Sequence, residues 1–163
     1  TGAGMIFGNT GGVMEAALRT VYRVLEGKEA PADFYQLRPV RGLSNRKEAE
    51  VTIAGKKLRV CILYGTAAAE EFLAEDMNGY HFVEVMTCPG GCISGAGQPD
   101  CGSVPVSDVV RKKRIQSLYQ ADEQAERRNS MDNPEIGTIY HEFFKEPLSM
   151  LSEKLLHTTY KRK

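Results

Sequence analysis

The fold is decided by one short stretch, Leu58-Arg59-Val60-Cys61-Ile62-Leu63-Tyr64. Apolar residues at alternate positions predict a β-strand, and towards its end the intervening positions, Cys61 and Leu63, are apolar as well. A strand that is apolar on both faces is typical of a sheet covered by helices on both sides. The stretch therefore predicts an α/β fold in which a mixed β-sheet has flanking helices.

The neighbouring residues predict the rest of the sheet. Residues 49–64 alternate between apolar and polar side chains on either side of Gly55-Lys56, which predicts a hairpin with its turn there. Thr66 is a suitable N-cap, residues 67–76 predict a helix, and residues 80–86 predict a further strand. This order of elements fits a mixed sheet, because a helix that joins two strands allows them to be parallel.

Two further segments precede the hairpin. Apolar residues recur every three or four positions over residues 11–26, which predicts an amphipathic helix. Residues 34–40 are expected to be extended, and Pro39 restricts them to a sheet edge or to the end of a strand.

The last third of the chain predicts helices only. Ser107 is a suitable N-cap for a helix that starts at Asp108, and Asn133-Pro134-Glu135 places a cap, a first-turn proline and an acid in order. A final helix carries leucines at three- and four-residue spacing. We therefore expect residues 1–105 to form the α/β part and residues 106–163 to form an α-helical C-terminal extension.

The composition is that of a globular protein without a strong charge. Hydrophobic residues make up 42% and charged residues 26% of 163 residues, and 21 basic against 21 acidic residues give a formal net charge of zero. A neutral chain has no general electrostatic attraction to nucleic acid or to an anionic membrane. The basic run at residues 111–114 lacks interleaved aromatic residues, which favours a solvated helix face or a docking face for a small acidic redox partner. We expect no nucleic-acid partner, and no membrane span because no apolar run approaches roughly 20 residues.

The four cysteines are too few for a disulfide scaffold in a chain of this length. Cys61 stands alone in the apolar stretch, whereas Cys88, Cys92 and Cys101 fall within fourteen glycine-rich residues. Such clustering indicates a metal or redox site in a reducing compartment, so we expect a cytoplasmic protein. The first residues predict no signal peptide, and without an initiating methionine the chain is expected to be a processed product or a piece of a longer protein.

The most informative segment begins within the last predicted strand. Residues 84–99 run Glu-Val-Met-Thr-Cys-Pro-Gly-Gly-Cys-Ile-Ser-Gly-Ala-Gly-Gln-Pro and place two thiols, Cys88 and Cys92, in a loop of small side chains. Glycine lets the backbone approach a bulky group closely and lets several N–H groups converge on a thiolate or sulfide. Because thiolates prefer soft metals and iron–sulfur clusters, the loop suits a large, sulfur-rich cofactor better than a single zinc ion.

A zinc site and a disulfide stay open as alternatives for these thiols. A zinc site would need Cys101 and a histidine to complete four ligands, since a second pair of cysteines is missing. A disulfide between Cys88 and Cys92 is conceivable but would be unusual in a reducing compartment. Two cysteines provide half of the usual ligands of an iron–sulfur cluster, so the residues predict missing partners or ligands that are not protein.

Residues 84–99 resemble the third cluster-binding signature of the iron-only ([FeFe]) hydrogenases. Four other segments are also similar to that family: residues 2–19, 40–43, 111–122 and 155–160. The resemblance spans nearly the whole chain. It implies the C-terminal portion of the catalytic domain of such an enzyme, with a small-subunit-like helical extension over residues 106–163.

The resemblance implies an H-cluster, a [4Fe–4S] cubane joined to a diiron unit that carries CO, cyanide and a bridging dithiolate. In the family, the first cysteine of the signature ligates the cubane, which maps to Cys88. The second cysteine ligates the cubane and bridges to the diiron unit, which maps to Cys92. Met86 would pack near the diiron unit and Phe7 would line the same pocket, although from the residues alone both predict ordinary core packing.

The implied activity is the reversible reduction of protons to dihydrogen, with electrons from ferredoxin or an NAD(P)-linked partner. Two earlier signatures of the family supply the other two cubane cysteines, a cysteine that relays protons and a lysine that holds a cyanide, and neither is found in this sequence. We therefore assign no catalytic residue to this chain. The N-terminal half of the catalytic domain, or a partner subunit, is expected to complete the site.

Two other functions stay open. Hydrogenase-like proteins of eukaryotic iron–sulfur assembly share this ancestry, hold iron–sulfur clusters and lack hydrogenase activity. A truncated domain that binds no cofactor is the third possibility. The Pro89-Gly90-Gly91 core of the loop and the long C-terminal helices favour the hydrogenase interpretation.

We make a separate prediction for each of four more residues. Ala96 replaces a glycine of the family pattern and is expected to be tolerated if its φ is negative. Cys101 has no counterpart in that pattern and is expected to be a free thiol. We expect Cys61 to be a buried strand residue and His81 to pack beside a strand rather than to bind a metal.

Overall fold

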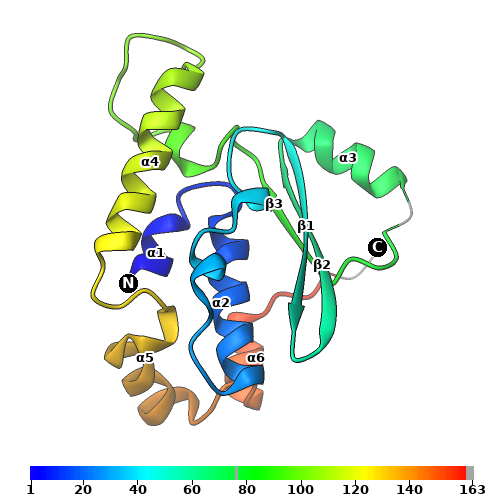
Figure 1. The fold of residues 1–163 in the computed structure, drawn as a ribbon, viewed down its shortest axis with the longest axis vertical. Coiled ribbons are helices and arrows are strands. Elements are labelled where there is room, and N and C mark those ends of the chain that lie inside the picture. The colour runs from blue at the N-terminus through cyan, green and yellow to red at the C-terminus, as the bar shows by residue number, and fades with distance from the viewer. Residues whose placement is uncertain (76, 161–163) are drawn as a thin grey trace.

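A computed structural model describes residues 1–75 and 77–160 of the chain. Its sheet has the strand order β1-β2-β3, where β1 is Arg46–Ile53, β2 is Lys56–Tyr64 and β3 is Phe82–Met86 (Figure 1). β1 runs antiparallel to β2 and β3 runs parallel to it. The predicted mixed sheet is confirmed.

The helices around the sheet are α1 (Gly2–Ile6), α2 (Gly12–Glu26), α3 (Thr66–Ala74) and α4 (Asp108–Gln124). α2 lies on one side of the sheet and α3 on the other, while α1 and α4 lie on the side of α2 that faces away from the sheet (Figure 1). α3 connects β2 to β3, so it is the crossover that allows these two strands to be parallel.

Each face of β2 packs against a different helix. Val60 and Ile62 belong to the core between the sheet and α2, whereas Cys61 and Leu63 belong to the core between the sheet and α3. All four side chains are at most 1% exposed. The predicted α/β fold, with a strand that is apolar on both faces, is confirmed.

The carboxyl ends of the two parallel strands meet at one edge of the sheet. Tyr64 of β2 is in register with Met86 of β3, and the N–H of Gly65 donates to the Met86 carbonyl at 2.8 Å. In open α/β sheets, ligands bind beyond the carboxyl ends of the strands. The glycine-rich loop that carries Cys88 and Cys92 leaves the sheet at this edge.

A second core joins α1, α2 and α4. Ala3, Ile6, Ala16 and Tyr119 form it. A Cβ on Gly12 would lie 1.7 Å from the Ile6 carbonyl oxygen, so glycine is what allows the first turn of α2 to meet the end of α1.

Charged side chains are buried between α2 and α4. Arg19 is fully buried, and its guanidinium donates to Glu15 and to both carboxylate oxygens of Asp122 at 2.7–2.9 Å. Arg41 donates to Glu15, and Arg128 donates to Asp122. These two carboxylates thus hold three guanidinium groups. Arg19 and both carboxylates are fully buried, whereas Arg41 and Arg128 are partly exposed.

The last part of the described chain is helical, as predicted. Ser107 caps α4 and Asn133 caps α5 (Pro134–Ile139), each through its side-chain oxygen. A π-helical turn over Tyr140–Phe144 and the helix α6 (Met150–Leu156) follow. Among the described residues, no helix combines the length and the apolar character needed to cross a bilayer.

The prediction that residues 34–40 are extended is wrong. They belong to two 3-10 turns, Ala32–Tyr35 and Arg38–Val40, which carry Phe34 and Val40 into the core. The N–H groups of both core residues bond to carbonyls three positions earlier, so this segment satisfies its backbone locally and needs no strand partner.

Two turn positions also differ from the prediction. The hairpin turns one residue earlier, at Ala54 and Gly55, and both have positive φ, as a tight two-residue turn requires. Thr66 does not cap α3, because Gly65 occupies the N-cap position and Thr66 is the first helical residue. The predicted end of this helix falls on Asp76, which lies outside the described residues.

Candidate functional site

Cys88 and Cys92 lie in the loop that leaves the carboxyl end of β3. Cys88 is half-buried, and Cys92 is exposed at the start of a 3-10 turn, Cys92–Ser94. Neither forms a disulfide. A Cβ on Gly95 would lie 3.9 Å from the Cys88 sulfur, so the chain turns back towards Cys88 after it has passed Cys92.

The loop is fastened to the opening segment of the chain by two backbone hydrogen bonds. The Thr10 N–H donates to the Gly90 carbonyl at 3.0 Å, and the Ile93 N–H donates to the Gly8 carbonyl at 3.1 Å. Gly91 lies between these bonds with a φ of 95°, and a Cβ there would lie 2.8 Å from the Gly8 oxygen and the Thr10 nitrogen. Glycine at this position therefore allows the two segments to meet.

We expect Gly91→Ala to lower the free energy of unfolding by about 3 kcal/mol, through strain at positive φ and displacement of packed backbone. Gly97→Ala is the matched control, because Gly97 has a φ of 92° but no atom within 4 Å of where its Cβ would lie. The control should lose only about 1 kcal/mol. Urea unfolding of both variants measures the difference, and equal losses would show that close approach is not the reason for glycine at position 91.

Glu84 of β3 fixes the start of α2. Its two carboxylate oxygens accept the N–H groups of Gly11 and Met14 at 2.6 and 2.7 Å. Gly11 is the N-cap of α2 and has no side chain that could do this, so the neighbouring strand provides the cap. Burial raises the pKa of the Glu84 carboxyl, although the two N–H groups and the charge of Lys47 oppose that shift.

Lys47 of β1 holds the same opening segment. Its ammonium donates to the carbonyls of Thr10 at 2.8 Å and Gly42 at 3.1 Å, and the residue is buried. Burial lowers the pKa of Lys47 to about 8, against the opposing influence of Glu84. Thr10 is thus held by Lys47 through its carbonyl and by Gly90 through its N–H.

The burial of Lys47 predicts a pH dependence of stability. Between about pH 8 and the ordinary lysine pKa of 10.5, the unfolded chain binds the proton more strongly than the folded chain. The contribution of Lys47 to the free energy of unfolding therefore rises with pH across that window, by at most about 1.4 kcal/mol per pH unit. We expect wild type to gain stability relative to Lys47→Met over this range in urea unfolding, and a constant difference would show that Lys47 keeps its ordinary pKa.

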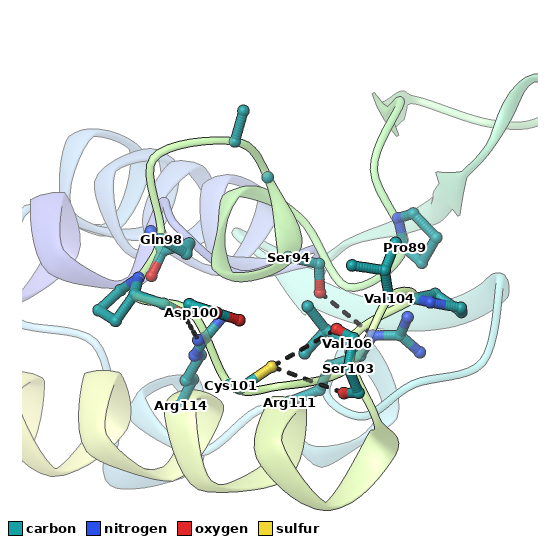
Figure 2. A pocket seen from close by; sticks show the side chains of 14 residues that line it. Pro89, Ser94, Gln98, Asp100, Cys101, Ser103, Val104, Val106, Arg111 and Arg114 are labelled. Carbon is teal, nitrogen blue, oxygen red and sulfur yellow. Dashed lines mark hydrogen bonds between the residues drawn. The ribbon is translucent and has the colours of Figure 1, made fainter.

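Two arginines of α4 hold the loop from the other side. Arg114 donates to the Ile93 carbonyl at 2.6 Å and to the Pro99 carbonyl at 2.8 Å. Arg111 donates from Nε to the Ser94 hydroxyl at 3.1 Å. Figure 2 shows both side chains reaching from α4 to the loop. They line a hollow there, and its volume is about 480 Å³.

The basic run at residues 111–114 is therefore only partly a solvated helix face. Lys112 and Lys113 are exposed, as that prediction requires. Arg111 and Arg114 are half-buried, and their three-residue spacing places them on one face of α4. The prediction is wrong for these two residues, because the loop covers that face.

Met86 and Phe7 lie next to the loop along the chain. Met86 is the last residue of β3 and is half-buried. Phe7 is the C-cap of α1, is 44% exposed and precedes Gly8, whose carbonyl accepts the N–H of Ile93. Neither side chain is a fully buried core residue of this chain.

The other residues that the sequence singled out do not hold the loop that carries Cys88 and Cys92. Cys61 is fully buried in β2, and burial raises the pKa of its thiol. Cys101 is a free thiol. His81 is exposed and accepts the N–H of Arg59 at its Nδ1 atom, 3.1 Å away. Ala96 is not among the residues with positive φ, so the methyl group causes no backbone strain there.

The donor set limits what the loop can hold. Within residues 1–75 and 77–160, no three histidine, cysteine or acidic side chains come together as a possible metal site. The structure therefore gives no support to zinc held by Cys101 and a histidine. Two free thiols on a glycine loop fit half of the ligand set of a [4Fe–4S] cluster, and the other half would come from other residues.

Four residues that hold the loop or the opening segment against it were not predicted: Glu84, Lys47, Arg111 and Arg114. The role of Glu84 could have been predicted from the sequence, because an acidic residue within an apolar strand needs a buried hydrogen-bond partner. The spacing of the two arginines was a weaker signal, because a basic run on a helix more commonly faces solvent.

Comparisons with known protein families give two matches along the chain. Residues 1–96 match the iron only hydrogenase large subunit, C-terminal domain. Residues 108–163 match the iron hydrogenase small subunit. The first match alone covers more than half of the chain.

The chain is also similar to curated proteins that are much longer. It is 39% identical over 166 residues to iron hydrogenase 1 of Clostridium pasteurianum, which covers 99% of this chain and 29% of that protein. It is 43% identical over 164 residues to the NADP-reducing hydrogenase subunit HndD of Solidesulfovibrio fructosivorans, with 98% and 27% covered. A more distant relative, cytosolic iron-sulfur assembly component 3 of Mus musculus, is 28% identical over 160 residues, with 94% and 31% covered. The chain thus spans less than a third of the length of these relatives.

Solved structures of [FeFe]-hydrogenases are also similar to this chain. An apo [FeFe]-hydrogenase HydA1 from Chlamydomonas reinhardtii superposes with a TM-score of 0.69 at 32% sequence identity, covering 94% of this chain and 45% of that chain. The architecture around β2 and the two family matches lead to the same conclusion. This chain belongs to the iron-only hydrogenase family and is similar to its C-terminal portion.

Proposed function

We propose that this chain is the C-terminal part of the H-cluster-binding catalytic domain of an [FeFe]-hydrogenase, an enzyme that reversibly reduces protons to dihydrogen. The observation that supports it most is the pair of free thiols, Cys88 and Cys92, on a glycine loop in a chain of this family. Within the chain, we assign residues 1–105 to the catalytic domain and residues 106–163 to a small-subunit-like extension.

Cys88 and Cys92 would hold the cofactor as thiolates. We assign Cys88 to a [4Fe–4S] cubane, and Cys92 to the same cubane and to the link with a diiron unit that carries CO and cyanide. When bound, this H-cluster would provide the metal centre for proton reduction and would pass on the electrons that an external donor supplies. Thiolates are soft ligands, so they favour iron in such a cluster over hard cations.

The rest of the loop keeps these ligands in place. Glu84 and Lys47 fix the opening segment that lies against the loop, and Arg114 fixes the far side. A ligand pair that is already positioned loses less conformational entropy when the cofactor binds. Met86 and Phe7, at the border of the loop, would limit the access of water to the cofactor.

We expect Met86→Leu to cost less than about 1.5 kcal/mol of folding stability, because the two side chains have similar volumes. In the matured assembly, the same change should alter the rate of hydrogen evolution or shift the infrared bands of the diiron ligands. Urea unfolding and infrared spectroscopy measure the two effects. An unchanged rate and spectrum would place Met86 away from the diiron unit.

The remaining parts of the site would come from elsewhere. We propose that an N-terminal half, or a partner subunit, supplies two further cubane cysteines, the proton-relay cysteine and the lysine that holds a cyanide. Electrons would be exchanged with ferredoxin or with an NAD(P)-linked partner, and the name of the relative HndD, an NADP-reducing hydrogenase subunit, favours the NADP-linked partner. We propose a cytoplasmic location for the assembly.

Reconstitution tests this proposal. The 163-residue chain, purified anaerobically and supplied with iron and sulfide, should show no hydrogen evolution from reduced methyl viologen and should bind little iron. Addition of a chain with the two missing cysteine signatures, together with the diiron cofactor, should restore both. Robust turnover by this chain alone would refute the incomplete site.

A second candidate is a hydrogenase-like iron–sulfur protein without hydrogenase activity. The similarity to an iron-sulfur assembly component favours it. Iron bound to the complete assembly, without infrared bands of metal-bound CO and cyanide, would support this candidate. The absence of any bound iron would instead support a domain that carries no cofactor.

A further inference from the structure

The segment that follows Cys92 has little backbone support of its own. Within residues 93–99, the hydrogen bonds from Ser94, Gly95 and Gln98 reach back only three residues. Glycines in this segment widen the range of backbone conformations that it can adopt. Its shape in the folded chain therefore depends on side chains from other elements.

Arg114 joins the two ends of this segment. One guanidinium nitrogen donates to the Ile93 carbonyl at 2.6 Å, and the other donates to the Pro99 carbonyl at 2.8 Å. Because the guanidinium is planar and rigid, these two bonds together fix the separation of the two carbonyls. A lysine ammonium is a point charge without this fork, so it would hold them less well.

This contact acts directly beside Cys92. Ile93 is the next residue, and it is held through its N–H by Gly8, through its carbonyl by Arg114 and through its buried side chain. Arg111 adds a bond to the Ser94 side chain. Because Ile93 and Ser94 are held by the opening segment and by α4, the backbone of Cys92 next to them has little freedom to move.

Arg114 also places a positive charge at the loop. Arg111 forms an ion pair with Asp108, whereas the partners found for Arg114 in the described part of the chain are the two carbonyls. A cation near an iron–sulfur cluster favours its reduced, more negative state. Such a charge would therefore raise the reduction potential of a cluster bound to this loop.

We infer that Arg114 is a positioning residue for Cys92. Through Arg114, α4 sets the conformation of the glycine-rich loop that carries Cys88 and Cys92, and it sets the reduction potential of a cluster bound there. The effect on potential rests on the proposed function. The effect on the loop does not, because it concerns the chain without a cofactor.

Amide hydrogen exchange of the full 163-residue chain tests the effect on the loop. The hydrogen-bonded amides of residues 93–98 are those of Ile93, Ser94, Gly95 and Gln98. Arg114→Gln should make exchange at these amides roughly tenfold faster, because two bonds from a charged donor are lost. Arg114→Lys should lie between this variant and the wild type. Lys112→Gln removes a neighbouring charge from the exposed face of the same helix and should change nothing.

The amides of β2 serve as the control for folding. They should exchange at the wild-type rate in every variant, because β2 lies in cores that the Arg114 contacts do not include. Unchanged exchange at residues 93–98, or an equal increase in β2, would overturn the inference.

The reduction potential of the cubane in the matured assembly tests the second effect. Arg114→Gln should shift this potential to a more negative value, while Arg114→Lys and Lys112→Gln should stay closer to the wild type. A cluster that binds with the same potential in Arg114→Gln would overturn the inference and leave the proposed function intact. A wild-type assembly that binds no cluster would overturn the proposed function, and hydrogen exchange would still decide whether Arg114 holds the loop.

Discussion

Replacing Cys92 by alanine is expected to abolish iron binding in the complete assembly, and with it all hydrogen evolution. The change deletes a thiolate that no neighbour can replace. Cys88 is already assigned as the other ligand of the loop, and Cys61 is fully buried in β2 beneath α3. Iron analysis and an assay with reduced methyl viologen measure the two losses.

The other cysteines provide matched controls for this experiment. Cys101→Ala should keep both iron and activity, because Cys101 lies beyond the cluster-binding loop. Cys61→Ala should cost on the order of 1 kcal/mol of stability and leave the iron content unchanged. Full hydrogen evolution by Cys92→Ala would show that the ligand assignment is wrong.

Asp122→Ala is expected to lower the free energy of unfolding by about 3–5 kcal/mol. Asp122 is fully buried and accepts hydrogen bonds from Arg19 and from Arg128. Without this carboxylate, the fully buried Arg19 keeps only Glu15 as an acidic partner, and Glu15 also pairs with Arg41. Because Asp122 is removed while its partner Arg19 stays fully buried, the cost exceeds that of losing an exposed ion pair.

An exposed ion pair provides the control for Asp122. Glu50 and Lys57 pair across the hairpin at 3.0 Å, and both side chains are exposed. Glu50→Gln should change the free energy of unfolding by less than about 1 kcal/mol. Urea unfolding compares the two variants, and a similar small loss for both would show that the buried charges contribute nothing beyond a surface pair.

The parts of the fold that the sequence predicts are those with a local or periodic signal. β2 alternates between two apolar sets because it is covered on both faces, and this pattern alone indicates the sheet and its helices. Ser107 and Asn133 cap their helices as predicted, because an N-cap bonds to backbone two or three residues away.

The parts that were missed depend on contacts far along the chain. Residues 2–6 contain two glycines, a composition that disfavours a helix, yet they form α1. The N–H groups of Gly2 and Ala3 donate to the carbonyls of Arg127 and Arg128, which no local pattern reveals. The cap of α2 is likewise invisible in its own segment, because it is provided by Glu84, about seventy residues later.

The residues of the candidate site likewise fall into those that the sequence predicts and those that it does not. The two cysteines carry a visible signal, because thiols at this spacing among glycines are uncommon outside metal and redox sites. The role of Arg114 was hidden, because its partners are backbone carbonyls whose positions depend on the course of the loop. A sequence thus indicates the ligands of such a site more readily than the residues that position them.

The infrared spectrum of this chain, matured anaerobically with the missing N-terminal half and the diiron cofactor, is the most direct test of the proposed function. We predict bands of iron-bound CO and cyanide in the wild-type assembly and none in the Cys92→Ala assembly. Iron that binds to the wild type without these bands would contradict the hydrogenase proposal, and bands that persist in Cys92→Ala would contradict the assignment of Cys92 as a ligand.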